Sequence, residues 1–280
     1  HDDQHGTAII SLAALLNAVK LNGKKLSDLQ VVVNGAGAAG LACANFYILA
    51  GVKRENVVIC DSKGVVNKQN ASNAAKMALA TDRDCRTLAE AMRGADVFLG
   101  CSTGNCVTPE MIASMNRGAI VFAMANPVPE IMPDLALQAG AFVVGTGRTD
   151  FPNQINNVLG FPGIFRGALD ARALDITDAM KLAASSALAE IACQEIPADC
   201  LETLQTAYPA DAAAGMFTGK NPLKASYVIP KPFDARVVPH VARKVAEAAM
   251  RTGVAQQQIS DLDQYECAVS QRIRKQHSCC

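Results

Sequence analysis

The stretch VVVNGAGAAG, residues 31–40, decides the fold that this sequence predicts. It joins a run of β-branched residues to a turn in which Gly35, Gly37 and Gly40 form the pattern GxGxxG. The first glycine permits a tight turn, the second lets the backbone approach a pyrophosphate, and the third lets a helix pack closely on the strand. A strand that passes through such a turn into a helix therefore predicts a dinucleotide site.

The residues after the turn strengthen this prediction. A helix is expected from about residue 41 to 49, and its unpaired N–H groups and positive dipole end would face the phosphates. We assign Ala38 and Ala39 to the cofactor site with the glycines. A second buried run, residues 57–60, ends at Asp61, 21 residues after Gly40, where an acid would contact the adenine ribose. Dinucleotide binding is thus favoured over a purely structural turn.

The choice between NAD and NADP depends on the residues that follow the second strand. Asp61 favours NAD, because a carboxylate repels a 2′-phosphate. Ser62 and Lys63, with Lys68 nearby, supply a hydroxyl and ammonium groups that could hold that phosphate. The lysines could equally be solvated loop residues. We assign Asp61, Ser62 and Lys63 to the cofactor site and prefer NADP over NAD.

The wider pattern predicts an α/β fold. Apolar strand-like runs alternate with helical ones, which is typical of parallel βαβ units. The predicted fold is a doubly wound, mostly parallel Rossmann-type sheet with flanking C-terminal helices. Strands are expected at 29–33, 57–60, 97–100, 120–124 and 142–144, and helices at 8–19, 41–49, 87–92 and 109–115.

The character of the sequence changes from about Gly167 onward. Long Ala-rich helices are expected at 179–193 and 235–250, and a more charged one at 260–275. The stretch 198–231, with several Pro and Gly, is expected to be irregular. The domains expected are residues 1–21, the start of an active-site motif and a linking helix; 22–165, the dinucleotide-binding domain; and 166–280, a helical segment that packs on it.

Composition excludes several function classes. The 280 residues are 50% hydrophobic, and 26 basic residues balance 26 acidic ones, so no charge pattern for nucleic acid or anionic membrane is present. No apolar run approaches the roughly 20 residues that span a bilayer. The ten cysteines show no CxxC pair or zinc-ligand spacing. We therefore expect reduced thiols and a cytoplasmic location.

Polar segments follow three of the predicted strands, where parallel sheets bind ligands. They are CSTG at 101–104, ANPVPE at 125–130 and TGRTDFPNQINN at 146–157. We assign Ser102 and Thr103 to the cofactor. Asn126 precedes proline, so its amide is free to hold a carboxylate or hydroxyl of a ligand, although a simple Asn-Pro turn is the alternative. Asn156 and Asn157 could equally cap a helix.

The first seven residues, HDDQHGT, place two acids before a Gly-Thr step and an apolar helical run. Asp2 and Asp3 could hold a divalent cation, move a proton, or simply cap the helix that starts near Thr7. Hard cations require several oxygen ligands, and two acids are too few for a site. A chain rarely begins inside its own chemistry, so either a preceding segment has been removed or this interpretation of the two acids as an active-site motif is wrong.

Five motifs of this sequence, taken in their order along the chain, together resemble the malic enzymes, which are decarboxylating malate dehydrogenases. The resemblance is to the compact bacterial-type form of that family. The resemblance runs from His1 to about Val254. It implies NAD(P)-dependent oxidative decarboxylation of L-malate to pyruvate and CO₂, with Mg²⁺ or Mn²⁺ as the Lewis acid. The motifs are HDDQHGTA, VVVNGAGAAG, FAMANPVPEIMP, TGRTDFPNQINNVLGFPGIFRGALD and YVIPKPFDARVVPHVA.

The resemblance also implies residue roles. Asp3 would ligate the metal, Asp2 would assist proton transfer by a catalytic lysine, and Thr7 would help bind cofactor phosphate. Asn126 and Asn157 would bind malate. The family's other metal ligands, a Glu-Asp pair, and its catalytic tyrosine and lysine precede HDDQHGT in an N-terminal domain that is absent here. The chain is therefore expected to be a cofactor-binding portion that is inactive alone.

Other hypotheses remain open. A malolactic enzyme would convert malate to lactate, another Rossmann dehydrogenase would lack these combined motifs, and a non-catalytic nucleotide-binding module would have lost its catalytic half. The family forms dimers and tetramers, so a homodimer or homotetramer is expected. A mitochondrial location is possible, because any targeting peptide would lie upstream.

Overall fold

A computed structural model describes residues 1–277, without the side chains of Asp3 and of residues 274–277. The chain divides into two compact units. The first, the sheet unit, comprises residues 1–156 with 224–226, and the second, the helical unit, comprises residues 157–223 and those from 227 onward. Within the described residues, no helix has both the length and the apolar character needed to cross a membrane.

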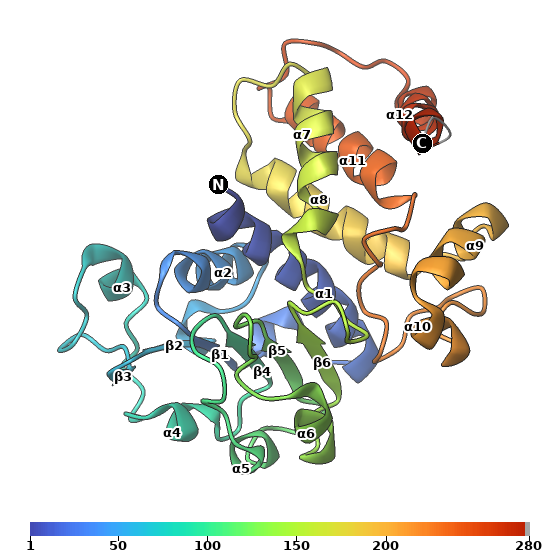
Figure 1. The fold of residues 1–280 in the computed structure, drawn as a ribbon. Coiled ribbons are helices and arrows are strands. Elements are labelled where there is room, and N and C mark those ends of the chain that lie inside the picture. Colours follow the sequence, from blue (N-terminus) through green and yellow to red (C-terminus); the bar gives the residue numbers. More distant parts are fainter. Residues whose placement is uncertain (278–280) are drawn as a thin grey trace. The chain divides into compact units, whose positions relative to one another are not determined.

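The sheet unit is built on one six-stranded sheet, which confirms the predicted fold class (Figure 1). The strand order is β3-β2-β1-β4-β5-β6, and every pairing is parallel except that of the short edge strand β3 with β2. The strands are β1 Val31–Asn34, β2 Val57–Asp61, β3 Gly64–Val65, β4 Val97–Gly100, β5 Ile120–Ala123 and β6 Val143–Thr146.

Helices cover both faces of this sheet (Figure 1). One face carries α1 (Thr7–Asn22) and α2 (Ala38–Leu49), and the other carries α4 (Leu88–Met92), α5 (Pro109–Ala113) and α6 (Pro133–Gln138). The short α3 (Ala74–Ala78) follows the edge strand β3. Register explains the α4–α6 face: Val32 pairs with both Val58 and Phe98, and all three side chains are buried in one apolar cluster with residues of these helices.

Two predicted boundaries shift for local reasons. Helix α2 begins three residues earlier than expected, because the Leu41 N–H already donates to the Gly37 carbonyl at 3.0 Å. Strand β1 begins at Val31 rather than Leu29, because the Leu29 N–H donates to the Leu26 carbonyl at 3.3 Å and closes a short 3₁₀ turn. The earlier start of α2 places Ala38, Ala39 and Gly40 in its first turn.

The turn between β1 and α2 depends on close backbone contact. Gly35 has a φ of +123°, which side chains rarely adopt, and a Cβ there would lie 2.5 Å from the Cys101 carbonyl oxygen. A Cβ on Gly40 would overlap the carbonyl oxygen of Gly35. Both glycines are therefore required for the helix to leave the strand at this angle.

The helical unit contains the long helices that the sequence predicts. Helix α11 packs against α7, α8 and α12. The helices are α7 Phe161–Asp170, α8 Asp178–Ala192, α9 Ala198–Ala207, α10 Pro209–Ala213, α11 Val237–Arg251 and α12 Leu262–His277.

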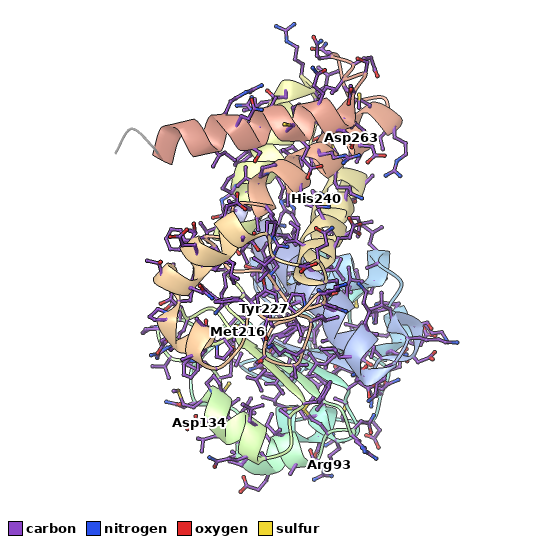
Figure 2. All side chains as sticks on the ribbon, turned by 90° about the vertical axis from the view of Figure 1, so that its right-hand side faces the viewer. Arg93, Asp134, Met216, Tyr227, His240 and Asp263 are labelled. Carbon is purple, nitrogen blue, oxygen red and sulfur yellow. The ribbon has the colours of Figure 1, made fainter. Side chains whose placement is uncertain are left out.

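The prediction of an irregular stretch from residue 198 to 231 is wrong for its first part, where α9 and α10 lie. Its prolines do not break these helices, since Pro197 caps the start of α9 and Pro209 is the first residue of α10. The apolar side chains of this segment are buried in one core, and their burial stabilises it. Two residues of the core, Met216 and Tyr227, are labelled in Figure 2. This core includes Cys200, Leu204, Met216, Phe217 and Tyr227.

The cysteines that the structure describes form no disulfide with one another. Several are buried, and burial raises the pKa of Cys60 to about 12. Such a thiol stays protonated near neutral pH and acts as a small apolar side chain.

We expect Gly40→Ala to destabilise the sheet unit, because the added methyl group would overlap the Gly35 carbonyl oxygen. The free energy of unfolding should fall by about 1–3 kcal/mol. Gly37→Ala is the matched control: nothing lies within 4 Å of a Cβ there and φ is −88°, so its cost should stay near 0.5 kcal/mol. Urea unfolding followed by circular dichroism measures both, and equal midpoints would contradict this account.

Candidate functional site

The carboxyl ends of four parallel strands meet at one edge of the sheet (Figure 1). Asn34, the last residue of β1, is in register with Cys60 on one side and Gly100 on the other, and Gly100 pairs with Ala123. The segments that follow these strands therefore leave from the same edge, which is where open α/β sheets bind ligands.

The glycine turn presents an open surface at this edge. Gly37 and Ala38 are exposed, and a Cβ on Gly37 would meet no atom within 4 Å. The first turn of the 12-residue helix α2 starts directly behind it, so its unpaired N–H groups and positive dipole end are available to an anion. A pyrophosphate fits this arrangement.

Asp61, at the end of β2, is held by two donors. The Lys76 ammonium lies 2.6 Å from Oδ2, and the Lys63 backbone N–H donates to Oδ1 at 2.9 Å. Burial alone would raise the pKa of Asp61, but these two hydrogen bonds bring it below its ordinary value. Ser62 and the Lys63 side chain are exposed at the same point, whereas Lys68 pairs with Asp82. The cation that faces Asp61 is thus Lys76, from α3.

Ser102 and Thr103, after β4, are exposed beside the glycine turn. The Asn34 side-chain amide donates to the Ser102 hydroxyl at 2.8 Å. The Cys101 N–H donates to the Asn34 carbonyl at 2.8 Å. The residue that precedes the glycine turn therefore positions the segment after β4.

Asn126, after β5, is exposed, and its side-chain amide makes no hydrogen bond within the described part of the chain. The Asn126–Pro127 peptide bond is cis. The preceding residue, Ala125, is anchored, because its N–H donates to the Glu130 carboxylate at 3.0 Å. An anchored backbone with an unpaired amide is suited to binding a carboxylate or hydroxyl.

The first residues form a π-helical turn, Asp2–Gly6, that runs into α1 and packs against α2. Asp2 and Thr7 thus lie on the segment that borders the helix of the glycine turn. The metal ligand expected from the resemblance, Asp3, has a side chain outside the described residues. Among the described side chains, no three His, Cys, Asp or Glu residues gather to hold a metal ion. These residues alone do not fit Mg²⁺ or Mn²⁺.

The second predicted substrate residue, Asn157, belongs to the helical unit. It is half-buried and begins a 3₁₀ helix, Asn157–Leu159, whereas Asn156 ends the main segment of the sheet unit.

Sequence reasoning missed three residues of the strand-end network: Asn34, Lys76 and Glu130. Glu130 stands inside a quoted motif, and an acid between apolar residues is a signal for a buried, hydrogen-bonded carboxylate. Lys76 follows Asp61 by 15 residues on a separate helix, and nothing in the sequence indicates that contact.

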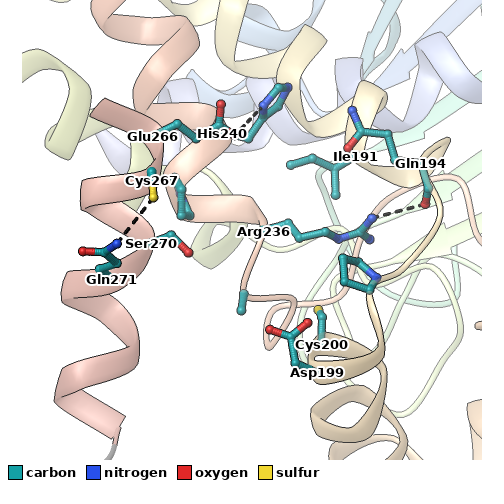
Figure 3. A pocket seen from close by; sticks show the side chains of 13 residues that line it. Ile191, Gln194, Asp199, Cys200, Arg236, His240, Glu266, Cys267, Ser270 and Gln271 are labelled. Atoms are coloured by element: carbon teal, nitrogen blue, oxygen red, sulfur yellow. Dashed lines mark hydrogen bonds and ion pairs between the residues drawn. The ribbon is translucent and has the colours of Figure 1, made fainter. Parts of the chain in front are cut away.

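A cavity of about 380 Å³ lies within the helical unit, between α8, α9, α11 and α12 (Figure 3). Arg236, His240 and Glu266, which line it, are paired. The Arg236 guanidinium contacts the Asp234 carboxylate and the Gln194 carbonyl. His240 lies between Glu190 and Glu266, with each ring nitrogen 3.0 Å from a carboxylate oxygen. These pairs hold the helices together.

Both ring nitrogens of His240 donate only when the ring is protonated. Burial alone would lower the pKa of His240, but hydrogen bonds to Glu266 and Glu190 raise it above its ordinary value. The same contact with His240, with help from Arg243, lowers the pKa of Glu266 to about 2.

We expect the stability of the helical unit to fall as pH rises through the raised pKa of His240. Because the pKa of His240 is higher in the folded state than in the unfolded state, protonation of His240 stabilises the fold. This stabilisation is fully present below the ordinary pKa of about 6.5 and is lost once the pH exceeds the folded-state pKa. The free energy of unfolding of the helical unit should fall by about 1 kcal/mol over this pH range. Urea midpoints at acidic and alkaline pH measure it, and His240→Gln should remove the difference. An unchanged pH dependence in that variant would contradict the assignment.

Comparisons with known proteins agree with this geometry. Residues 4–207 match the family model for the NAD-binding domain of malic enzyme. An NADP-dependent malic enzyme of Rhizobium meliloti is 47% identical over 276 residues, which cover 97% of this chain and 35% of that protein. An NAD-dependent malic enzyme of the same organism is 45% identical over 269 residues, covering 95% of this chain and 33% of that protein.

A solved structure agrees as well. The crystal structure of Entamoeba histolytica malic enzyme superimposes with a TM-score of 0.82 at 37% identity, over 98% of this chain and 54% of that one. The chain thus spans about a third of the length of the two bacterial relatives. The fold, the open glycine turn and the matched family model together show that this chain belongs to the malic enzyme family and contains its NAD-binding domain.

Proposed function

We propose that these residues are the NADP-binding portion of an enzyme that oxidises and decarboxylates L-malate to pyruvate and CO₂. The observation that carries this proposal is the placement of the open glycine turn and the unpaired amide of Asn126 along one sheet edge. A cofactor and a small oxygen-rich substrate need such neighbouring sites. The relatives that match this chain are named malic enzymes, which supports malate as the substrate.

Each assigned residue then has a physical task. The first turn of α2, with Gly35, Gly37, Ala38, Ala39 and Gly40, holds the pyrophosphate through backbone N–H groups. A dinucleotide held there would supply the nicotinamide as the hydride acceptor for oxidation at C2 of malate.

The remaining tasks fall to side chains. Ser102 and Thr103 border the cofactor, and Thr7 contributes to its phosphate site. The Asn126 amide orients malate through its oxygens, and the family resemblance assigns substrate binding to Asn157 of the helical unit as well. By the family resemblance, Asp2 would assist a proton transfer by a lysine, and Asp3 would supply one ligand of a metal ion.

The Asp61–Lys76 pair supports NADP as the preferred cofactor. An NAD site needs an acid whose oxygens are free to accept the ribose 2′-hydroxyl. Here the Lys63 N–H occupies one oxygen of Asp61 and the Lys76 ammonium occupies the other. The ammonium offsets the carboxylate charge and brings a phosphate-binding group to the point where a 2′-phosphate would lie.

We expect Lys76→Gln to weaken NADP⁺ binding by about tenfold or more, because a charge-assisted hydrogen bond to phosphate is lost. NAD⁺ binding should hold or improve, because the Asp61 carboxylate becomes available to a hydroxyl. Calorimetric titration with each cofactor measures both affinities.

Lys68→Gln is the matched control, since Lys68 is an exposed lysine of the same segment that pairs with Asp82. Parallel titrations of Lys63→Ala show whether the neighbouring lysine contributes. A loss of NADP⁺ affinity in Lys68→Gln equal to that in Lys76→Gln would contradict the assignment.

The 280 residues alone should bind cofactor without turning over malate. Asp3 is the one metal ligand assigned among these residues, and none of their lysines or tyrosines is assigned to the proton transfers. We expect no NADPH formation above the rate without malate, measured by absorbance with Mg²⁺ present. Robust malate-dependent NADPH formation by this polypeptide would overturn this view.

The whole reaction is tested on the complete reading frame. Sequencing the transcript upstream of the codon for His1 defines that frame, and the expressed protein should form pyruvate and NADPH from malate. Lactate in place of pyruvate would indicate a malolactic enzyme, and no product with intact cofactor binding would indicate a nucleotide-binding module.

We further propose a homodimer or homotetramer in a reducing compartment, the cytoplasm or a mitochondrion. Exposed apolar side chains on and after α7, namely Phe165, Leu169 and Leu174, support self-association. The free thiols support the reducing compartment.

A further inference from the structure

Glu130 is a fully buried acid at the ligand edge of the sheet. It occupies space that only a glycine leaves open, because a Cβ on Gly100, the last residue of β4, would overlap its carboxyl group. Burial raises the pKa of Glu130, although backbone N–H donors act in the opposite direction. A buried carboxylate is costly unless it is hydrogen-bonded, so its partners indicate what it does.

Its two oxygens each accept from a different loop. Oε1 accepts from the Ser102 N–H, after β4, and Oε2 accepts from the Ala125 N–H, after β5, both at 3.0 Å. The backbones of the same loops also pair, since the Asn105 N–H donates to the Pro129 carbonyl and the Val107 N–H donates to the Glu130 carbonyl, again at 3.0 Å. Residues 101–107 and 124–130 are therefore cross-linked through Glu130.

The network continues to the glycine turn. The Asn34 amide, one residue before Gly35, donates to the hydroxyl of Ser102. A continuous set of hydrogen bonds thus runs from the start of the glycine turn, through Ser102 and the Glu130 carboxylate, to Ala125, the neighbour of Asn126. All of these residues belong to the sheet unit.

We propose that Glu130 is a positioning residue that couples the cofactor loop to the substrate loop, so that a dinucleotide bound at the glycine turn and Ser102 orders the loop that carries Asn126. The proposal rests on the proposed function, which assigns these two loops to cofactor and malate. A carboxylate suits this task because it accepts on both sides, whereas a glutamine would place its NH₂ donor against one of the two N–H donors.

The test uses the 280-residue chain, NADP⁺ and amide hydrogen exchange. In the wild type, NADP⁺ should slow exchange at residues 34–41 and 101–107 and also at residues 124–130. In Glu130→Gln, NADP⁺ should still protect residues 34–41, its affinity should fall about three- to tenfold, and its protection of residues 124–130 should fall by at least about half. Glu130→Asp keeps the charge but is one methylene shorter, so NADP⁺ should protect residues 124–130 as weakly in this variant as in Glu130→Gln.

Glu55→Gln is the control for the loss of charge. Glu55 is an exposed glutamate of the same unit, so this variant should behave as wild type.

The outcomes separate this proposal from the function on which it rests. Failure of the wild type to bind NADP⁺ or NAD⁺ would overturn the proposed function and the coupling with it. Cofactor binding that leaves residues 124–130 unprotected in the wild type would overturn the coupling alone, even if the Glu130 variants do not fold. Wild-type coupling in folded Glu130→Gln would also overturn it, because a merely structural glutamate changes stability without changing how one loop responds to a ligand at the other.

Discussion

The close packing of Gly40 on the carbonyl of Gly35 is the constraint on which the ligand edge depends. Without a Cβ at either position, α2 can begin directly behind the end of β1, and its first-turn N–H groups face the open space at Gly37. The same approach brings Gly35 against the carbonyl of Cys101, which starts the loop after β4. One backbone contact thus sets the shape of the proposed phosphate site and the position of the neighbouring loop.

Two carboxylates at this edge are held in opposite ways, and the difference indicates their tasks. Asp61 is partly exposed beside a lysine, and its pKa lies below the ordinary value, so it stays charged at the position that we propose for the ribose or its phosphate. Glu130 is fully buried among backbone donors, and burial raises its pKa. A partly exposed, paired acid can discriminate between ligands, whereas a buried one holds the backbone in place.

Pattern reasoning predicted the sheet well, because fully buried parallel strands appear as continuous apolar runs. It missed the antiparallel edge strand β3, which has only two residues, and the helix α9, which lies in a stretch whose Pro and Gly residues suggested irregular structure. In the first case the signal is too short to read. In the second, burial of Cys200 and Leu204 in the core of the helical unit decides the outcome, and burial is not visible in a local window.

The sequence by itself determined the alternation of strands and helices, the glycine turn, and the residues at the strand ends, because periodicity and glycine geometry are local properties of the chain. Its motifs also indicated the family. Only the tertiary structure showed that the ammonium that pairs with the Asp61 carboxylate belongs to Lys76 rather than Lys63. It also showed that Glu130 joins the loops after β4 and β5. Those contacts join residues on different elements, and it is the parallel register of the sheet that brings the elements to one edge.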